Sequence, residues 1–232
     1  MTRSTADLGI HDEIRIETGG GPISGALAVP ENALGVVLFA HGSGSSRHSP
    51  RNKYVAEMLN QRRIGTLLID LLTPEEEAVD VDTAHHRFDI ELLRIRLLMA
   101  ADWLAANEST QDLPLALFGA STGAAAALVA AAQRPEIVAV VSRGGRPDLA
   151  GDALRHVHAA TLLIVGDLDF PVIPLNRAAF SQLERSREKE MILVGEATHL
   201  FEEPGALEEV ARLAGDWFVR HFEGPRRQKT PR

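Results

Sequence analysis

Short apolar runs alternate with amphipathic segments along most of this chain. Residues 13–17 and 23–29 alternate apolar and polar side chains on either side of the turn cluster Gly19-Gly20-Gly21-Pro22, which predicts a hairpin of two half-exposed strands. Later runs are continuously apolar and predict strands buried on both faces, as in a parallel sheet covered by helices. These runs are residues 36–40, 66–69, 115–118, 137–141, 162–165 and 191–194.

Helical patterns separate these runs. Ser49 and Pro50 offer an N-cap and a proline at the first helical position, and apolar residues follow at helical spacing. Further helices are predicted at 88–103, 121–133, 175–183 and 206–222, with one short helix near 151–155. The alternation of strand and helix predicts one doubly wound α/β domain over residues 1–222. We expect the basic tail at 223–232, broken by two prolines, to be disordered.

The amino-acid composition of the chain excludes several classes of protein and of functional site. The 232 residues include no cysteine, which excludes disulfides, Cys-ligated zinc, iron–sulfur clusters and a cysteine nucleophile. The formal charge of −8 is opposite in sign to that of a protein that coats nucleic acid. There is no apolar leader, and no apolar run approaches the roughly 20 residues that span a bilayer. We therefore expect a cytoplasmic protein with no nucleic-acid or membrane partner.

The most informative stretch is Gly119-Ala120-Ser121-Thr122-Gly123. An apolar strand precedes it and an alanine-rich helix follows, which is the setting that a Gly-x-Ser-x-Gly nucleophile elbow requires. The serine hydroxyl must project from a sharp turn, and the glycines leave space where side chains would collide with a neighbouring element. The alternative interpretation is that Ser121 only caps the helix.

A serine nucleophile needs a base and an acid that orients the base. In this architecture the chain order is Ser, then Asp or Glu, then His, each following a strand. His199 is the histidine that follows the last predicted strand. Asp167 and Asp169 both follow the preceding strand, and we favour Asp169 because it lies further along the loop, where the chain can bend towards the base.

The third predicted strand leads into His41-Gly42-Ser43-Gly44. An oxyanion intermediate needs two preorganised N–H donors, and we assign them to Thr122 and Ser43, with Gly44 as the alternative to Ser43. A phosphate-binding loop is disfavoured, because neither the Gly-Lys-Ser/Thr ending of a P-loop nor a Gly-x-Gly-x-x-Gly pattern is present. No cofactor is expected.

Together these motifs resemble the α/β-hydrolase superfamily, and within it the dienelactone hydrolase-like branch. The resemblance implies a single-domain, mostly parallel eight-stranded sheet with helices on both faces. Relatives place the acid in a Gly-x-x-Asp loop, which again points to Asp169. Dienelactone hydrolases proper use a cysteine nucleophile, so the absence of cysteine moves the expectation towards a serine esterase.

About twenty residues separate the fourth and fifth buried runs, so we expect a minimal cap and a small or shallow pocket. Arg47, Arg143 and Arg146 are predicted in loops at the same edge of the sheet as Ser121. They and Gly44 are candidates for substrate binding, since arginine suits bidentate anion recognition, although structural salt bridges are the favoured alternative for the arginines. His85-His86 lacks a third ligand at suitable spacing, so no metal site is expected.

The resulting hypothesis is a serine hydrolase that cleaves a small carboxylic ester or lactone through Ser121, His199 and Asp169. Two alternatives remain. The chain could be a ligand-binding or interaction protein on a hydrolase fold, or an acyltransferase that uses an acceptor other than water. The sequence leaves monomer and homodimer equally open.

Overall fold

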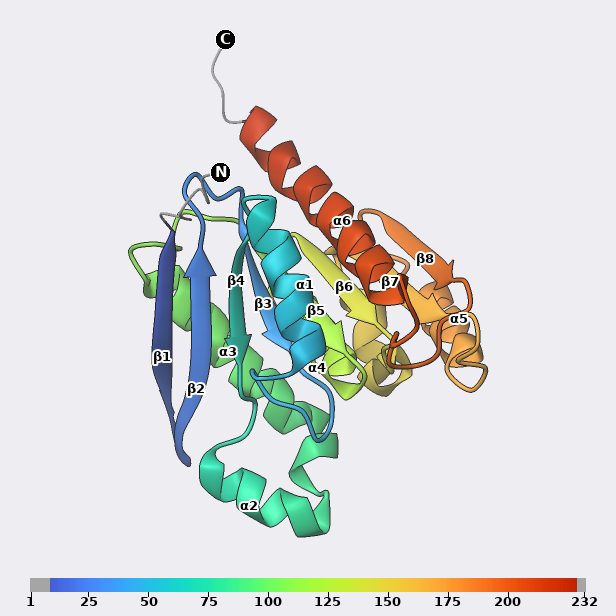
Figure 1. Cartoon of the computed structure of the whole chain (residues 1–232), viewed down its shortest axis with the longest axis horizontal. Helices are drawn as coiled ribbons and strands as arrows, with labels where there is room; N and C mark the ends of the chain where they lie inside the picture. The colour runs from blue at the N-terminus through green and yellow to red at the C-terminus, as the bar shows by residue number, and fades with distance from the viewer. Residues whose placement is uncertain (1–8, 229–232) are drawn as a thin grey trace, which may run out of the picture.

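The apolar runs form one sheet in the computed structural model, which describes residues 9–228 (Figure 1). Its strands are β1 (Ile10–Thr18), β2 (Gly21–Val29), β3 (Val36–Ala40), β4 (Gly65–Ile69), β5 (Leu115–Ala120), β6 (Ala139–Arg143), β7 (Ala160–Gly166) and β8 (Lys189–Val194). Their order is β1-β2-β4-β3-β5-β6-β7-β8. The β1–β2 and β2–β4 pairs are antiparallel and the others are parallel, so the predicted hairpin and mostly parallel sheet are confirmed.

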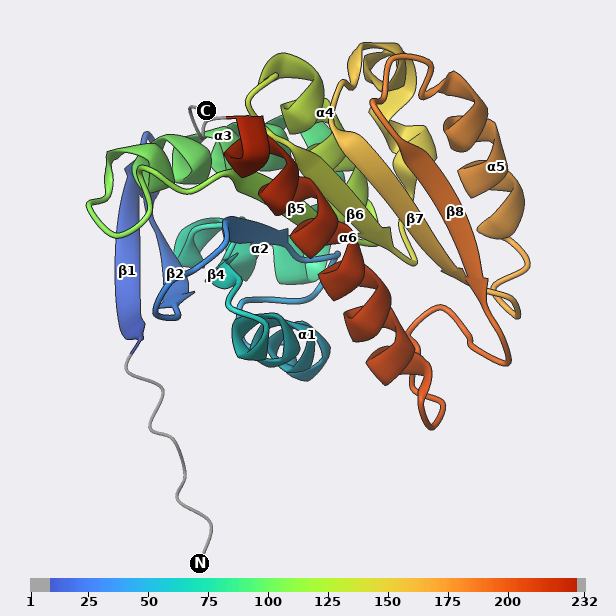
Figure 2. The ribbon, with the colours of Figure 1, turned by 90° about the horizontal axis from the view of Figure 1, so that it is seen from above.

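Helices cover both faces of this sheet, as predicted (Figure 2). They are α1 (Pro50–Gln61), α2 (Pro74–Thr83), η1 (His86–Phe88), α3 (Ile90–Ala106), α4 (Thr122–Gln133), η2 (Pro147–His156), α5 (Ile173–Gln182) and α6 (Ala206–Gln228). On one face, α1 and α6 pack against Phe39, Phe118 and Val141. On the other face, α3, α4, η2 and α5 pack against the opposite side chains of the same strands. Two apolar layers thus hold the central strands rigidly.

Local sequence explains how α1 and α4 begin next to the sheet. The Ser49 hydroxyl accepts a hydrogen bond from the Asn52 N–H and caps α1, and Pro50 occupies the first turn. Most of α4 is alanine and is fully buried, which lets this helix approach the sheet closely. The amino termini of both helices follow strand ends, at the carboxyl edge of the sheet.

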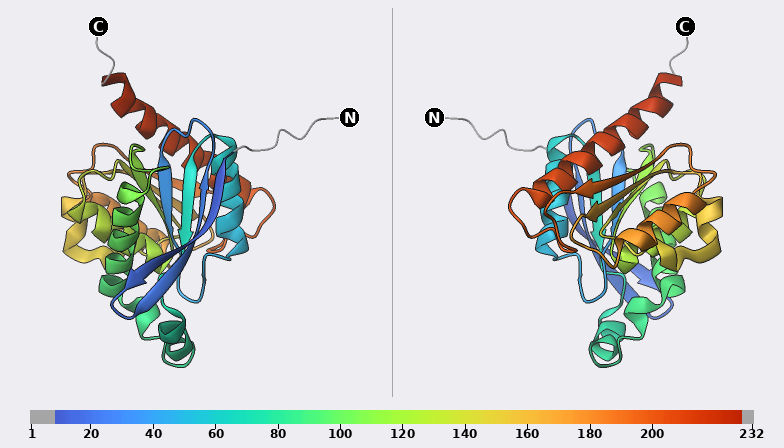
Figure 3. Two further views of the ribbon diagram at one scale, coloured as in Figure 1. Left: turned by 90° about the vertical axis from the view of Figure 1, so that its left-hand side faces the viewer. Right: turned by 90° about the vertical axis from the view of Figure 1, so that its right-hand side faces the viewer.

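None of the helices predicted from the sequence falls within residues 72–86, whereas Pro74–Thr83 forms α2. A capping box stabilises its first turn: the Thr73 hydroxyl accepts from the Glu76 N–H, and the Glu76 carboxylate accepts from the Thr73 N–H. Helix α2 projects beyond the carboxyl ends of the parallel strands (Figures 1 and 3). It is the main addition to the domain at that edge.

The last helix is also longer than predicted. The sequence predicts a helix over 206–222 followed by a tail that contains Pro225 and Pro231, but α6 continues to Gln228. A proline inside a helix removes a hydrogen bond and can kink the helix without ending it. The predicted tail therefore begins as helix, and its residues 229–232 lie outside the described part of the chain. Within residues 9–228, no helix has the length and apolar character needed to cross a bilayer.

Candidate active site

Ser121 stands on a strained turn between β5 and α4. Its φ and ψ are 50° and −123°, and its side chain makes no capping hydrogen bond, so the helix-cap interpretation does not account for this residue. A Cβ atom at Gly119 would lie 2.4 Å from Ala124 Cα, and one at Gly123 would lie 2.3 Å from Ala40 O. Both glycines of the motif are therefore required by close backbone approach, which leaves the Ser121 hydroxyl presented at the carboxyl edge of the sheet.

His199 and Asp169 form a direct pair at the same edge. His199 Nδ1 lies 2.6 Å from Asp169 Oδ2, with the Asp169 residue 7% exposed and the His199 side chain 37% exposed. The loops that carry them are joined, because the Leu168 N–H donates to the Ala197 carbonyl. Of the two candidate acids, Asp169 is the one that is hydrogen-bonded to the imidazole of His199. Among the described residues, Asp167 makes no hydrogen bond to His199, and its buried Oδ1 has no partner.

Residues 143–146, here called the β6 turn, link the serine to the histidine. The Ser121 N–H donates to the Arg143 carbonyl at 3.4 Å, and the Arg146 N–H donates to the Ser121 carbonyl at 3.0 Å. Gly144 has a φ of 50°, and a Cβ atom there would lie 2.8 Å from the His199 carbonyl oxygen. No hydrogen bond joins Ser121 Oγ to His199 within the described residues. Such a bond often forms only when substrate is present.

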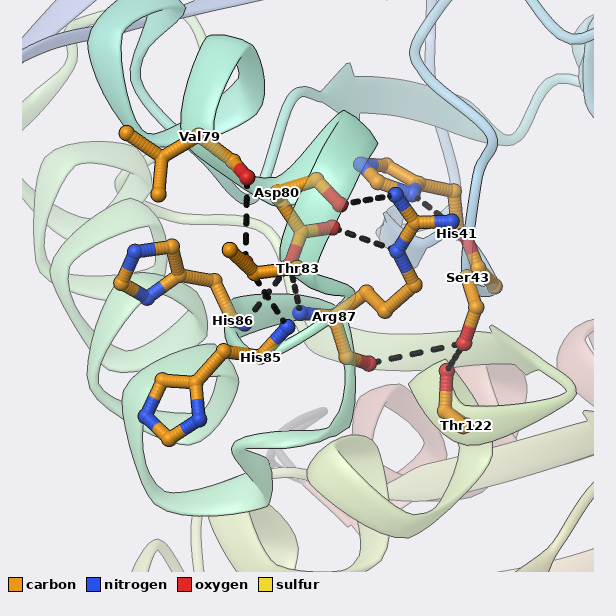
Figure 4. A network of polar contacts seen from close by, with 10 residues as sticks. His41, Ser43, Val79, Asp80, Thr83, His85, His86, Arg87 and Thr122 are labelled. Carbon is orange, nitrogen blue, oxygen red and sulfur yellow. Dashed lines mark hydrogen bonds and ion pairs between the residues drawn. The ribbon is translucent and has the colours of Figure 1, made fainter.

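The two assigned oxyanion residues also meet beside the nucleophile. Ser43 Oγ lies 3.0 Å from Thr122 Oγ1 and 3.5 Å from the Arg87 carbonyl oxygen (Figure 4). A Cβ atom at Gly42 would lie 2.9 Å from Ser121 Cβ, so the loop that carries Ser43 packs directly on the nucleophile. Thr122 opens α4, where the first helical N–H groups lack intrahelical partners. The arrangement can present N–H groups to a developing oxyanion.

Two polar anchors that the sequence reasoning missed hold this side of the site. Burial raises the pKa of Asp80, but hydrogen bonds from Arg87 and His86 lower it more, so it stays below its ordinary value. Asp80 Oδ2 accepts from Arg87 Nε at 2.5 Å, which ties η1 to α2 next to Ser43 (Figure 4). The capping box before α2 was the local signal that could have indicated an ordered segment here.

His41 is the second anchor. Its Nε2 accepts from the Leu71 N–H at 3.0 Å, and its Nδ1 lies 2.9 Å from the Gly42 carbonyl oxygen. Burial lowers the pKa of His41, so the neutral ring with a proton on Nδ1 satisfies both contacts. The ring therefore fixes the strand ends below the oxyanion loop.

The candidate substrate-binding arginines differ in their partners. Arg47 pairs with Asp70, and Arg146 forms two hydrogen bonds to Asp148. Arg143 is buried, and among the described residues its side chain has no ion-pair partner, with Nε and Nη1 buried without a hydrogen bond. Gly44 lies near Arg87, since a Cβ atom there would be 3.6 Å from Arg87 Nη1.

Two free volumes within residues 9–228 have linings that do not include His199. A crevice of about 10 Å³ is lined by the 41–45 loop, Arg87 and Thr122. A cavity of about 560 Å³, lined by Val36, Leu104 and Ile137 among others, lies at the opposite edge of the sheet and contains none of the assigned residues. Within residues 9–228, no cluster of three His, Asp or Glu residues could hold a metal ion.

Comparison with known proteins places this geometry in a family. No protein-family model matches the chain. The structure is similar to that of a dienelactone hydrolase from Anabaena variabilis, with 56% sequence identity, a TM-score of 0.88, and coverage of 92% of this chain and 98% of that one. Est1E from Butyrivibrio proteoclasticus has a TM-score of 0.75 at 16% identity, covering 91% of this chain and 99% of that one, which shows the fold alone.

Two proteins of Mycobacterium tuberculosis that carry the name "Putative phosphoribosyl transferase" are 54% identical over 224 residues. That match covers 96% of this chain, and the chain spans about half (49%) of the length of these curated relatives. The extent of the match to the Anabaena hydrolase decides the family. The chain belongs to the dienelactone hydrolase-like branch of the α/β-hydrolase superfamily.

Proposed function

We propose that this chain is a serine hydrolase that cleaves a carboxylic ester or lactone of a small substrate through an acyl-enzyme. The observation that carries the proposal is the hydrogen-bonded pair of His199 and Asp169, linked through the β6 turn to a serine on a nucleophile elbow. A module that only binds a ligand has no need for a nucleophile, a base and an orienting acid at one edge. The combination therefore favours acyl transfer.

Each residue of the proposed active site has its own role in ester hydrolysis. His199 takes the proton of the Ser121 hydroxyl as its oxygen attacks the substrate carbonyl, and later returns that proton to the leaving alcohol. Asp169 holds the imidazole by Nδ1 and stabilises its charged form. The N–H groups of Ser43 and Thr122 bind the oxyanion. Water, activated by His199, then attacks the acyl-enzyme and releases the acid.

The relatives support the acyl-transfer class without naming a substrate. One of them is a dienelactone hydrolase, and Est1E binds ferulic acid. We do not extend the phosphoribosyl transferase name to this chain, because those proteins are about twice as long as the region that matches. The remaining alternative is transfer to an acceptor other than water, which the same catalytic residues would support.

The test is hydrolysis of short 4-nitrophenyl esters by the purified chain and by Ser121→Ala. We expect the substitution to lower kcat by about 10⁴-fold or more, because the other groups have no nucleophile to activate. Ser181→Ala is the matched control, since Ser181 is an exposed residue of α5 whose hydroxyl donates to the Ala178 carbonyl. Ordinary turnover by Ser121→Ala would overturn the assignment.

A fluorophosphonate probe separates the alternatives. Covalent labelling that depends on Ser121, followed by hydrolysis of esters, identifies a hydrolase. A chain that neither reacts with the probe nor turns over esters would be a binding protein. Faster product formation with added alcohol than with water would identify an acyltransferase, and release of diphosphate from phosphoribosyl diphosphate would identify a phosphoribosyl transferase.

A further inference from the structure

Arg143, the last residue of β6, is a buried cation without a counter-charge. The residue is 7% exposed, its Nε and Nη1 atoms are buried without hydrogen-bond partners, and no carboxylate of the described residues forms an ion pair with it. Buried charges in proteins are normally paired, because an unpaired one loses its hydration without compensation. Arg96, which is 5% exposed, follows this rule by pairing with Glu76.

A second guanidinium lies close to the first. Burial lowers the pKa of Arg143 to about 10, and the positive charge of Arg51 contributes to the lowering. Arg143 therefore stays protonated near neutral pH. Arg51 lies in the first turn of α1, where its Nη1 donates to Glu202 at 2.9 Å, while its Nε is buried without a partner. The neighbourhood thus contains two cations and one partly exposed carboxylate, at the positive end of a helix dipole.

The backbone of Arg143 adjoins the reacting residues. Side chains alternate along β6, and Val141 faces the layer formed by α1 and α6, so Arg143 faces the same layer, towards the start of α1. Its backbone carbonyl accepts from the Ser121 N–H, and the next residue, Gly144, packs against His199. The backbone that carries the Arg143 side chain is therefore in contact with the nucleophile segment, and the residue after it is in contact with the base.

We propose that Arg143, supported by Arg51, is a binding subsite for an anionic group, carboxylate or phosphate, carried by the substrate of Ser121. The proposal rests on the function proposed above and narrows its substrate class to esters with a negative charge near the scissile bond. A guanidinium binds both groups by charge-assisted hydrogen bonds, and Nη2 is the guanidinium nitrogen of Arg143 that is not among the buried, unpartnered ones. The bound anion supplies the missing counter-charge. The other two candidate arginines are already engaged by Asp70 and Asp148.

The experiment compares two esters with four-carbon acyl groups, 4-nitrophenyl hemisuccinate and 4-nitrophenyl butyrate, which differ in one negative charge. The measured quantity is the ratio of kcat/KM for the charged ester to kcat/KM for the neutral ester. We expect Arg143→Gln to lower this ratio about 10-fold or more, because a desolvated charge pair is lost. Arg177→Gln, which removes a charge from an exposed position on α5, should leave the ratio unchanged. An unchanged ratio in Arg143→Gln overturns the proposal.

Thermal unfolding gives a readout that needs no turnover. Succinate and inorganic phosphate are added separately to the wild type, to Arg143→Gln and to Ser121→Ala. We expect one of the two anions to raise the melting temperature of the wild type and of Ser121→Ala but not of Arg143→Gln. The anion that does so identifies the subsite as one for a carboxylate or for a phosphate. Without added anion, Arg143→Gln should melt at or above the wild-type temperature, because it removes an uncompensated buried charge.

The two proposals fail separately. If neither anion shifts the melting temperature of the wild type, or if Arg143→Gln shifts equally, the subsite is refuted even when Ser121→Ala is inactive. If Ser121→Ala hydrolyses both esters as the wild type does, the proposed function is refuted, while the anion-dependent shift can still be observed. A strong fall in the melting temperature of Arg143→Gln without anion would indicate that the guanidinium supports the fold and would overturn the subsite.

Discussion

The backbone at Ser121 illustrates how single residues store strain in this molecule. A non-glycine residue at φ 50° and ψ −123° costs on the order of 1–3 kcal/mol. Hydrogen bonds from both sides hold it: its N–H donates to Arg143, and its carbonyl accepts from Arg146. The close approach of Gly123 to Ala40 removes the space into which the turn could relax. The hydroxyl is thereby kept in one place before substrate arrives.

The two aspartates of the acid loop give a prediction at the same scale. Asp169→Asn should lower kcat for ester hydrolysis by about 10³–10⁴-fold, because the amide no longer fixes the required tautomer of His199 or stabilises its charge. Asp167→Asn is the matched control two residues away, where no bond to His199 exists, and it should retain activity within a few-fold. A larger loss of kcat in Asp167→Asn than in Asp169→Asn would contradict the assignment.

At the scale of elements, the site depends on how α5 is attached to the β6 turn. Asn176 of α5 is fully buried, and its Nδ2 donates to the carbonyls of Gly145 and Val172, each at 3.0 Å. The Val172 N–H in turn donates to the Asp169 carbonyl. One amide thus joins the segment that carries the acid to the turn that contacts both the serine and the histidine. We regard Asn176 as a positioning residue.

Asn176→Leu tests that role. The loss of two buried donations should lower the free energy of unfolding by about 1–3 kcal/mol and should lower kcat more than it changes KM, since the acid and the nucleophile lose their common support. Gln182→Leu on the same helix removes an exposed bond to the Ala178 carbonyl and serves as the control. A variant that is less stable but keeps its kcat would show that Asn176 only supports the fold.

The same elements show what the sequence could and could not predict. Local patterns in the sequence predict the strands, the nucleophile elbow and the Ser-Asp-His order. They do so because a buried parallel strand or a tight turn requires particular residue types at neighbouring positions. Helix α2 was missed although Thr73 and Glu76 carried a capping signal. The isolation of Arg143 and the bridge from Asn176 to Gly145 depend on distances between residues far apart in the chain, which no local pattern encodes.

At the scale of the whole molecule, acid sensitivity should follow from the buried His41 and the partly buried His221. Burial lowers the pKa of His41 and of His221 below 6.5, so the unfolded chain binds more protons than the native state when the pH falls below that value. Stability is therefore retained above about pH 6.5 and is lost as the pH falls through the window beneath it, by up to about 1.4 kcal/mol per pH unit for each group. Carboxylates with lowered pKa values, such as Glu91 and Glu209, affect the free energy of unfolding only at more acidic pH.

Urea unfolding at pH 7.5, 6.5 and 5.5 measures this effect. The free energy of unfolding of the wild type should be nearly constant between the first two values and smaller at pH 5.5. His41→Gln should show a smaller decrease between pH 6.5 and 5.5 than the wild type, whatever its stability at pH 7.5. His48→Gln, at an exposed position, should behave as the wild type does. An undiminished decrease in His41→Gln would exclude His41 as a source of acid sensitivity.

The β6 turn has a consequence for engineering. Its four residues carry the carbonyl that holds the nucleophile, the glycine that faces the base and the unpaired guanidinium. Randomising these four positions to select for a new substrate would therefore alter the reaction rate in every clone. Few variants from such a library should combine a changed substrate preference with the wild-type kcat. Positions on η1 and α2 other than Arg87 and Asp80 lie outside this turn, so they offer a way to alter specificity without moving the reacting residues.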